Sequence, residues 1–265
     1  MKPKISVIMS VYNPHPYVQL EEAAASILRQ TEKDWEFLIY DDGSEEAVRE
    51  KLRCLAGSDP RIRLLEGDRN RGIAWGLNQC LANARGEYIA RMDADDLSLP
   101  GRLKIQAEFL DSHPEYDYIG CNAFLFDNAG VWGIRRMPAI PEKEDFLTFS
   151  PYIHPSVMFR RTVFETCGTY NTSQQMLRCE DYEIFMRMHI MGCRGYNLQK
   201  ELFCYREDEA GYRRRKFRRR IDEIRLRKNG FHAMGLTGPW AWLCRYRPLI
   251  GAVLPPGLYR RMKQG

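Results

Sequence analysis

The chain has 265 residues, of which 44% are hydrophobic and 28% are charged, as is ordinary for a folded globular protein. This length only slightly exceeds what one hydrophobic core supports, so one α/β domain with an appended segment is favoured over two equal domains. No run approaches the roughly 18 apolar residues of a membrane-spanning helix, so we expect any membrane to be touched rather than crossed.

The net charge of +5 conceals an uneven distribution along the chain. Residues 206–265 hold 16 Lys and Arg against 5 Asp and Glu, whereas residues 1–205 hold 24 against 30. The basic character therefore belongs to the C-terminal segment, and the rest of the chain is mildly acidic. The eight cysteines are scattered and form no Cys-x-x-Cys pair, so we expect free thiols in a reducing, cytoplasmic compartment.

In the first half of the chain, apolar runs typical of buried strands alternate with amphipathic runs typical of helices. The predicted strands cover residues 4–11, 35–40, 61–65 and 87–92, and the predicted helices cover 17–30, 45 onward, 73–84 and 100–112. This alternation over short connections predicts an α/β fold with a mostly parallel sheet flanked by helices. We expect Ser44 to cap the helix near Glu45, and Asp96 to cap the helix after Pro100.

From Tyr116 the pattern becomes mixed. A hairpin with a turn at 128–130, a short strand and an amphipathic helix are predicted for residues 118–137, 155–159 and 180–192. The C-terminal tail begins with a predicted basic helix, residues 211–229, followed by an aromatic, basic stretch broken by prolines. We therefore divide the chain into a body, residues 1–210, and an extension, residues 211–265.

Polar residues follow each of the four predicted strands of the first half. In strand order they are Tyr12 and Asn13, Asp41 and Asp42, Asn70, and Asp93 with Asp95. Because the carboxyl ends of parallel strands meet at one edge of a sheet, where α/β proteins bind ligands, we expect one shared crevice. Its carboxylates would repel an anionic ligand unless a divalent cation intervenes, and Mg²⁺ and Mn²⁺ favour such oxygen ligands.

The order and spacing of several segments resemble those of the family 2 glycosyltransferases, the inverting enzymes of GT-A fold. The segments are ISVIMSVYN, SILRQT, IYDDGS, NRGIAWGLNQCLANARGEYIARMDADD, LPGRL, HPSVMFRR and CEDYEIFMR, within residues 4–206. The resemblance implies a Rossmann-like GT-A body with a nucleotide-sugar-binding half, residues 1–115, and an acceptor-side half, residues 116–210. It further implies sugar transfer from a nucleotide-sugar donor, with a UDP-sugar expected, to a hydroxyl of a cell-surface glycan or lipid-linked oligosaccharide.

The resemblance also implies roles for the residues after the first three strands. Ser10 and Tyr12 are similar to the residues that line the base, with Tyr12 stacking on it, although many family members have proline where Ser10 stands. Asp42 is similar to the acceptor of the uracil imide N–H, and Asn70 to a group that helps hold the donor. For Tyr12 a place in the core, and for Asp42 a plain turn role, are the alternatives.

At the fourth strand, Asp93 resembles the residue that contacts the ribose or donor sugar. Asp95 resembles the residue that binds the metal, Mn²⁺ or Mg²⁺, between the two phosphates, where the cation assists departure of the diphosphate. Arg91 either helps hold the pyrophosphate or forms a structural pair with an aspartate.

On the acceptor side, Asp181 of the Glu180–Asp181 pair resembles the catalytic base. A carboxylate near a helix N-terminus is stabilised as the anion and is ready to accept a proton. Without the family match, the pair reads as an ordinary helix N-terminal charge. His154 falls where related enzymes keep a histidine beside the acceptor or diphosphate, although a lone histidine is more often structural.

The tail combines cations with aromatic residues. Arg213–Lys216 and Arg218–Arg220 form a cationic run, and Trp240 and Trp242 lie among further basic residues. This composition suits reversible attachment to an anionic membrane surface at the inner face of the cell membrane. Packing on the body or a dimer contact are the alternatives, and no nucleic-acid partner is expected because no such module is recognisable.

Other functional classes are less well supported. A non-catalytic nucleotide- or glycan-binding module of the same fold is disfavoured because the DDGS, DxD and Glu-Asp motifs are all complete. A dinucleotide oxidoreductase is disfavoured because no GxGxxG opens the first helix. The sequence does not specify the donor sugar, the acceptor or the oligomeric state.

Overall fold

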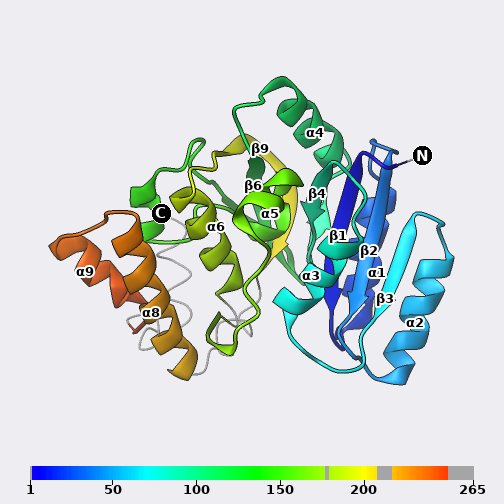
Figure 1. Cartoon of the computed structure of the whole chain (residues 1–265). Helices are drawn as coiled ribbons and strands as arrows, with labels where there is room; N and C mark the ends of the chain where they lie inside the picture. The colour runs from blue at the N-terminus through cyan, green and yellow to red at the C-terminus, as the bar shows by residue number, and fades with distance from the viewer. Residues whose placement is uncertain (1, 177–178, 208–216, 250–265) are drawn as a thin grey trace.

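The structure, a computed structural model, describes residues 2–176, 179–207 and 217–249. Within these residues nine strands form one sheet (Figure 1), ordered β3-β2-β1-β4-β8-β6-β9-β5, with β7 paired to β6. The strands are β1 (Ile5–Val11), β2 (Trp35–Asp41), β3 (Ile62–Glu66), β4 (Tyr88–Arg91), β5 (Leu97–Ser98), β6 (Tyr118–Asp127), β7 (Gly130–Arg135), β8 (Met158–Arg160) and β9 (Gly195–Arg206).

The helices and 3-10 segments connect and cover these strands. They are α1 (Tyr17–Leu28), α2 (Glu46–Gly57), α3 (Ile73–Asn83), α4 (Arg102–Ser112), η1 (Lys143–Leu147), η2 (His154–Ser156), α5 (Thr162–Cys167), η3 (Gln174–Met176), α6 (Glu180–Ile190), α8 (Phe217–Ala233) and α9 (Pro239–Arg245).

The first half of the sheet is parallel. β1 pairs in parallel with both β2 and β4, and β2 pairs in parallel with β3. Their carboxyl ends therefore share one edge, as the alternating sequence pattern predicted. The second half is mixed, because β6 pairs in parallel with β9 but antiparallel with β7 and β8. The predicted α/β fold with a mixed second half is confirmed.

Helices cover both faces of the sheet (Figure 1). Val7 and Met9 of β1 lie in one apolar cluster with residues of α1, α2 and α4. Ile8 lies in the other cluster, with residues of α3, α5 and α6. Successive side chains of a strand point to opposite faces, so an uninterrupted apolar run is what a strand covered on both sides requires.

Three expectations need correction. Strand β9 was not predicted, because Gln199, Lys200 and Glu201 interrupt its apolar pattern. The strand accommodates these polar residues because its middle is exposed or only partly buried. The short strand predicted for residues 155–159 begins only at Met158, since η2 occupies the preceding residues. Ser44 does not cap α2, whose N-cap is Glu45 without a side-chain cap, because the Ser44 hydroxyl accepts a hydrogen bond from the loop after β1.

The described part of the tail packs on the body. Leu226 and Phe231 of α8, and Ala241 and Cys244 of α9, are buried in the same cluster as Tyr182 of α6. This favours packing on the body, one of the two alternatives left open, and the boundary at residue 210 stays a prediction. The predicted basic helix is described from Phe217 onward, and 211–216 and 250–265 lie outside the described residues. None of the described helices is long and apolar enough to cross a bilayer.

Arg227 offers a test of how firmly the tail is joined to the body. Its side chain is 6% exposed, its Nη1 donates to the carbonyls of Leu147 (3.0 Å) and Cys244 (3.4 Å), and its Nε donates to Glu223 (3.1 Å). Arg227→Ala removes the buried donor to both carbonyls and the ion pair with Glu223, and is expected to lower the free energy of unfolding in urea by about 3 kcal/mol.

Arg225, on the same helix, is the matched control. Its side chain is 66% exposed and pairs only with Asp222 among the described residues. Arg225→Ala is expected to change the free energy of unfolding by less than about 0.5 kcal/mol. If the two variants lost the same free energy of unfolding, the buried guanidinium of Arg227 would not be what stabilises the packing of the tail on the body.

Candidate functional site

The loops after β1 and β2 are tied together at the carboxyl edge of the sheet. Asn13 donates its N–H to Ser44 Oγ (2.9 Å), and its Oδ1 accepts the N–H of Glu45 (2.9 Å). Gly43 has a φ of +77°, and a Cβ on it would lie 2.5 Å from Arg69 Cα. Glycine is therefore required for this turn to approach the loop after β3.

Asp42 links the end of β2 to the loop between β3 and α3. Its side chain is buried and accepts the N–H groups of Arg71 (2.9 Å) and Gly72 (2.7 Å). Burial raises the pKa of Asp42, and these two N–H groups oppose the rise. Asn70 is exposed and directly precedes Arg71. The loop thus brings the Asp42 carboxylate next to the backbone that follows Asn70, and the contact of Asp42 with uracil stays a prediction.

The two residues predicted to line the base take different positions. Tyr12 is 50% exposed just beyond β1, so a place in the core is excluded and its ring is open to a stacking partner. Ser10 packs under α3, where a Cβ on Gly76 would lie 2.1 Å from its Oγ. Contact between Ser10 and a base stays a prediction.

Arg91 ends β4 as a fully buried cation. Its guanidinium forms an ion pair with Asp93, and its carbonyl accepts a hydrogen bond from Arg102 Nη2 (2.8 Å). Its Nε has no hydrogen-bond partner among the described residues. The structural pair with an aspartate, left open by the sequence, is thus present. A contact of Arg91 or Asp93 with the donor stays a prediction.

Three carboxylates gather directly after β4. One oxygen each of Asp93, Asp95 and Asp96 lies within 4.8 Å of the others. Surrounding protein and the charge of Asp93 raise the pKa of Asp95 to about 6, although its side chain is exposed to solvent. Burial and both neighbouring charges raise the pKa of Asp96 well above its usual range.

The chemistry of this cluster fits a divalent cation. Asp96 is 1% exposed, and its Oδ2 has no hydrogen-bond partner in the part of the chain that the structure describes. Hard cations such as Mg²⁺ and Mn²⁺ take carboxylate oxygens, and their charge would offset the mutual repulsion of the three groups. The donor set therefore suits the predicted metal, with Asp95 as the exposed ligand.

Arg206, at the end of β9, holds this loop in place. Its N–H donates to Asp96 Oδ1 (2.7 Å), and its Nε donates to the Asp95 carbonyl (2.9 Å). Asp96 is therefore not the predicted helix cap, since α4 begins at Arg102 with Gly101 as its N-cap. Sequence reasoning missed Arg206 because it missed β9, although the apolar run 202–205 was a usable strand signal.

The residues predicted for the acceptor side, Glu180 and Asp181, begin helix α6. Glu180 is 8% exposed and Asp181 half-buried in the first turn of α6. Burial raises the pKa of Tyr170, Arg91 opposes the rise, and the charges of Asp181, Glu180 and Asp93 add to it. Tyr170, which sequence reasoning also missed, therefore lies within electrostatic reach of both groups of carboxylates.

His154 and Tyr170 form a buried pair between these groups. His154 Nε2 lies 2.8 Å from the Tyr170 hydroxyl, and the His154 ring meets the ring of Phe185 edge-on at 5.9 Å. The backbone N–H and C=O of Tyr170 both bond to the Asn78 amide (2.9 and 2.8 Å). His154 thus has a structural partner, and its contact with an acceptor or diphosphate stays a prediction.

The comparisons with known proteins agree on one family. Residues 6–179 match the family model described as "Glycosyl transferase family 2". The chain is 36% identical to the glycosyltransferase EpsE of Bacillus subtilis (strain 168), with 98% of this chain and 92% of EpsE covered. It is 30% identical to the amylovoran biosynthesis glycosyltransferase AmsE of Erwinia amylovora, with 71% of this chain and 70% of AmsE covered.

Solved structures share the fold. A fragment of S. aureus TarS in complex with UDP-GlcNAc aligns with a TM-score of 0.64 at 20% identity, covering 87% of this chain and 66% of the fragment. The mannosyltransferase PcManGT from Pyrobaculum calidifontis, in complex with GDP-Man and Mn²⁺, gives 0.64 at 20% identity, covering 99% and 79%. The chain spans 54% of the longer TarS structure. These likenesses confirm the GT-A fold.

The buried His154 predicts a specific pH dependence of stability. Burial and the nearby charge of Arg91 hold the pKa of His154 well below its usual value. Below about pH 6.5 the unfolded chain binds a proton that the folded chain excludes, so this group lowers stability as the pH falls. Between pH 6.5 and 5.0, the wild-type protein is expected to lose about 2 kcal/mol more than His154→Gln in urea unfolding.

His15, which is exposed, provides the control, and His15→Gln is expected to retain the wild-type pH dependence. If His154→Gln and the wild-type protein lost stability in parallel over this range, the imidazole would not be held neutral in the fold.

Proposed function

The chain belongs to glycosyl transferase family 2, and from this membership we propose that it moves a sugar from a nucleotide-sugar donor to an acceptor hydroxyl with inversion at the anomeric carbon. One observation supports the proposal: Asp93 after β4, and Glu180 and Asp181 at the start of α6, all lie within electrostatic reach of the buried Tyr170, whose hydroxyl is 2.8 Å from His154 Nε2. The carboxylates proposed to act on the donor and on the acceptor are then near one another, as we expect for single displacement.

We propose a UDP-sugar as the donor. Tyr12 would stack on the base, Asp42 would accept its imide N–H, and Asn70 would help hold the donor. The UDP-GlcNAc complex of the TarS fragment supports this choice. Because PcManGT was solved with GDP-Man, binding of UDP and of GDP should be compared to identify the nucleobase. Asp93 would contact the ribose or donor sugar, and Arg91 would fix the Asp93 carboxylate through their ion pair.

Asp181 is the proposed base. The acceptor oxygen forms a bond to the anomeric carbon on the face opposite the diphosphate, while its proton passes to the Asp181 carboxylate. The bond between the anomeric carbon and the diphosphate breaks, and its electron pair leaves with the nucleoside diphosphate. Asp181 lies in the first turn of α6, where the helix dipole favours a carboxylate, as a proton acceptor requires.

Asp95, with Asp93 and Asp96 beside it, would hold Mn²⁺ or Mg²⁺. When bound, such a cation supplies charge neutralisation for the departing diphosphate. The Mn²⁺ in the PcManGT complex supports this assignment. Arg206 keeps Asp96 oriented by donating its N–H, so the carboxylates remain converged while the donor enters.

The proposed acceptor is a hydroxyl of a cell-surface glycan or a lipid-linked oligosaccharide. AmsE is named for the biosynthesis of amylovoran, which supports a role in polysaccharide synthesis. Because the tail is strongly basic, we further propose that the enzyme works against the anionic inner face of a membrane.

Removal of the Asp95 carboxylate should separate metal-dependent from metal-independent binding. In calorimetry with UDP, Mn²⁺ is expected to strengthen binding to the wild-type protein, and Asp95→Asn should reduce that gain at least about tenfold. Glu108→Gln, which removes an exposed carboxylate of α4, should retain it. An undiminished effect of Mn²⁺ on the Asp95→Asn protein would exclude Asp95 as a ligand.

Asp181→Asn should separate chemistry from binding. We expect kcat for sugar transfer to fall about 10²- to 10⁴-fold, because the acceptor loses its base, while UDP binding is unchanged. Glu183→Gln is the control, since it removes a carboxylate from the same helical turn. The Glu183 carboxylate pairs with Arg187 (2.8 Å). Full turnover by Asp181→Asn would assign the base elsewhere.

A further inference from the structure

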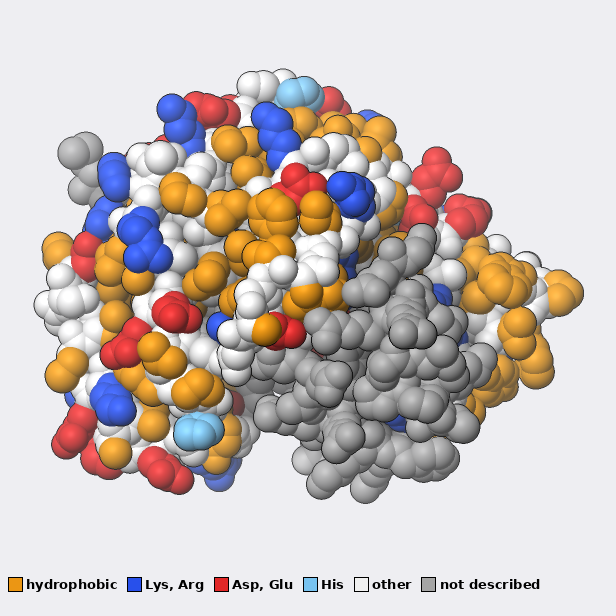
Figure 2. Space-filling view, turned by 180° about the vertical axis from the view of Figure 1, so that it is seen from behind, with side chains coloured by type: hydrophobic (Ala, Val, Ile, Leu, Met, Phe, Trp, Pro, Cys, Tyr) orange, Lys and Arg blue, Asp and Glu red, His pale blue; other side chains and the backbone are white. Residues whose placement is uncertain are grey.

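Helix α9 exposes its large apolar side chains to solvent. Trp240, Trp242 and Leu243 are 62%, 57% and 49% exposed, whereas Ala241 and Cys244 are buried against the body. At about 100° per residue Trp242 and Leu243 lie opposite the buried Ala241 and Cys244, and Trp240 lies at the margin of the buried side, so this short helix is apolar on both faces. Figure 2 shows hydrophobic side chains projecting at the right-hand end of the rear view, where α9 lies.

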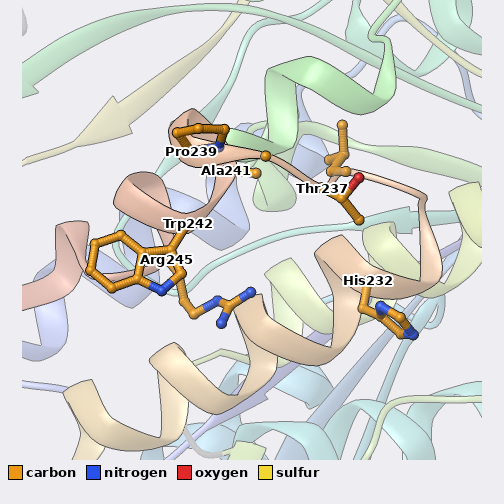
Figure 3. A pocket seen from close by; sticks show the side chains of 8 residues that line it. His232, Thr237, Pro239, Ala241, Trp242 and Arg245 are labelled. Atoms are coloured by element: carbon orange, nitrogen blue, oxygen red, sulfur yellow. The ribbon is translucent and has the colours of Figure 1, made fainter.

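A groove of about 300 Å³ runs beside this exposed face, between α8 and α9. Its lining includes the apolar Leu236, Pro239 and Trp242 and the polar His232, Thr237 and Arg245. In Figure 3 the Arg245 side chain extends from α9 toward α8. Its Nε is buried and has no hydrogen-bond partner within the described ranges. The groove therefore joins an unsatisfied cationic donor to an apolar wall.

The positive charge of this part of the chain favours an anionic lipid surface over a second copy of the chain as the binding partner. Residues 217–249, which contain α8 and α9, hold 8 Lys and Arg against 2 Asp and Glu, and Arg225, Lys228 and Arg247 are exposed. A second copy of the chain would bring an equally basic tail to the contact, which like-charge repulsion disfavours. An anionic lipid surface supplies the opposite charge and an apolar interior together.

We propose that α9 and the α8–α9 groove form the membrane-binding site of this protein. Trp240, Trp242 and Leu243 enter the interfacial region of an anionic bilayer, where tryptophan rings are favoured. Arg245, with His232 and Thr237, binds the phosphodiester of a lipid headgroup, because a guanidinium donates two hydrogen bonds to one phosphate. The site rests on the membrane contact proposed above and names the surface that makes it.

This placement has a consequence for the acceptor. The guanidinium of Arg227 on α8 lies 4.9 Å from the centroid of the Tyr182 ring, and Tyr182 directly follows Asp181. The membrane-binding unit is therefore packed on the helix that carries the proposed base. A lipid-linked acceptor held in the same bilayer would reach the site from that side.

Co-sedimentation of the full chain with vesicles tests the proposal. Wild-type protein is expected to bind vesicles of mixed phosphatidylglycerol and phosphatidylcholine more strongly than pure phosphatidylcholine, and added salt should reverse the excess. The double variant Trp240→Ser, Trp242→Ser should lower the partition coefficient about tenfold or more, because two interfacial anchors are lost. Arg245→Gln should weaken binding to the phosphatidylglycerol vesicles about fivefold while leaving binding to pure phosphatidylcholine vesicles unchanged.

Matched controls make the result specific to this surface. Val18→Ser on α1 and Lys104→Gln on α4 remove an exposed apolar and an exposed basic side chain elsewhere, and both should bind vesicles as the wild-type protein does. Leu243→Ser is a milder second variant, expected to show a smaller loss. Thermal unfolding verifies that each variant is folded, and UDP binding without vesicles should be unchanged in all of them.

Three outcomes would overturn the proposal. Absence of wild-type binding to phosphatidylglycerol vesicles would remove the membrane contact, and wild-type binding that the α9 variants share would place the contact elsewhere. Self-association abolished by the tryptophan substitutions, without vesicle binding, would identify a second copy as the occupant. UDP binding and sugar transfer are measured separately, so a negative result with vesicles would not contradict the proposed catalytic function.

Discussion

Three carboxylates held within 4.8 Å of one another repel strongly, and much of the surrounding structure serves to keep them there. Arg91 is buried beneath them and neutralises Asp93, while Arg206 binds Asp96 and the Asp95 carbonyl from the side. Burial, together with the repulsion that remains, raises the pKa of Asp95 and of Asp96. A bound cation, as proposed above, would offset this repulsion.

On the predicted acceptor side, the buried side chains next to the carboxylates are uncharged. Tyr170 and His154 fill the space between the two groups of carboxylates with uncharged, hydrogen-bonded side chains. Because the imidazole is buried, it contributes no second positive charge beside Arg91. The Asn78 amide holds the backbone of Tyr170 on both sides, which fixes the loop before α6 against α3. Uncharged, hydrogen-bonded side chains therefore lie within electrostatic reach of both groups of carboxylates.

The parallel half of the sheet was predictable because its strands are continuous apolar runs and its helices are amphipathic. The meeting of Asp42 with the loop of Asn70 followed from strand polarity alone. Strand β9 was harder to predict, since only the run 202–205 is continuously apolar and the strand pairs with β6 and β5, far away in the chain. For that reason Arg206 and Tyr170 escaped notice: their roles are created by distant partners, whereas the roles expected for Asp95 and Asp181 came from family motifs.

The bond from Arg206 to Asp96 spans 110 positions of the chain and so sets an order of events during synthesis. A growing polypeptide presents RMDADD long before it presents β9, and until then the carboxylate loop lacks its lateral support. A nascent chain or truncated fragment that ends before Arg206 contains every letter of the motif without its geometry. Assembly of the cation site is therefore a late event, governed by closure of a long-range contact rather than by translation of the motif itself.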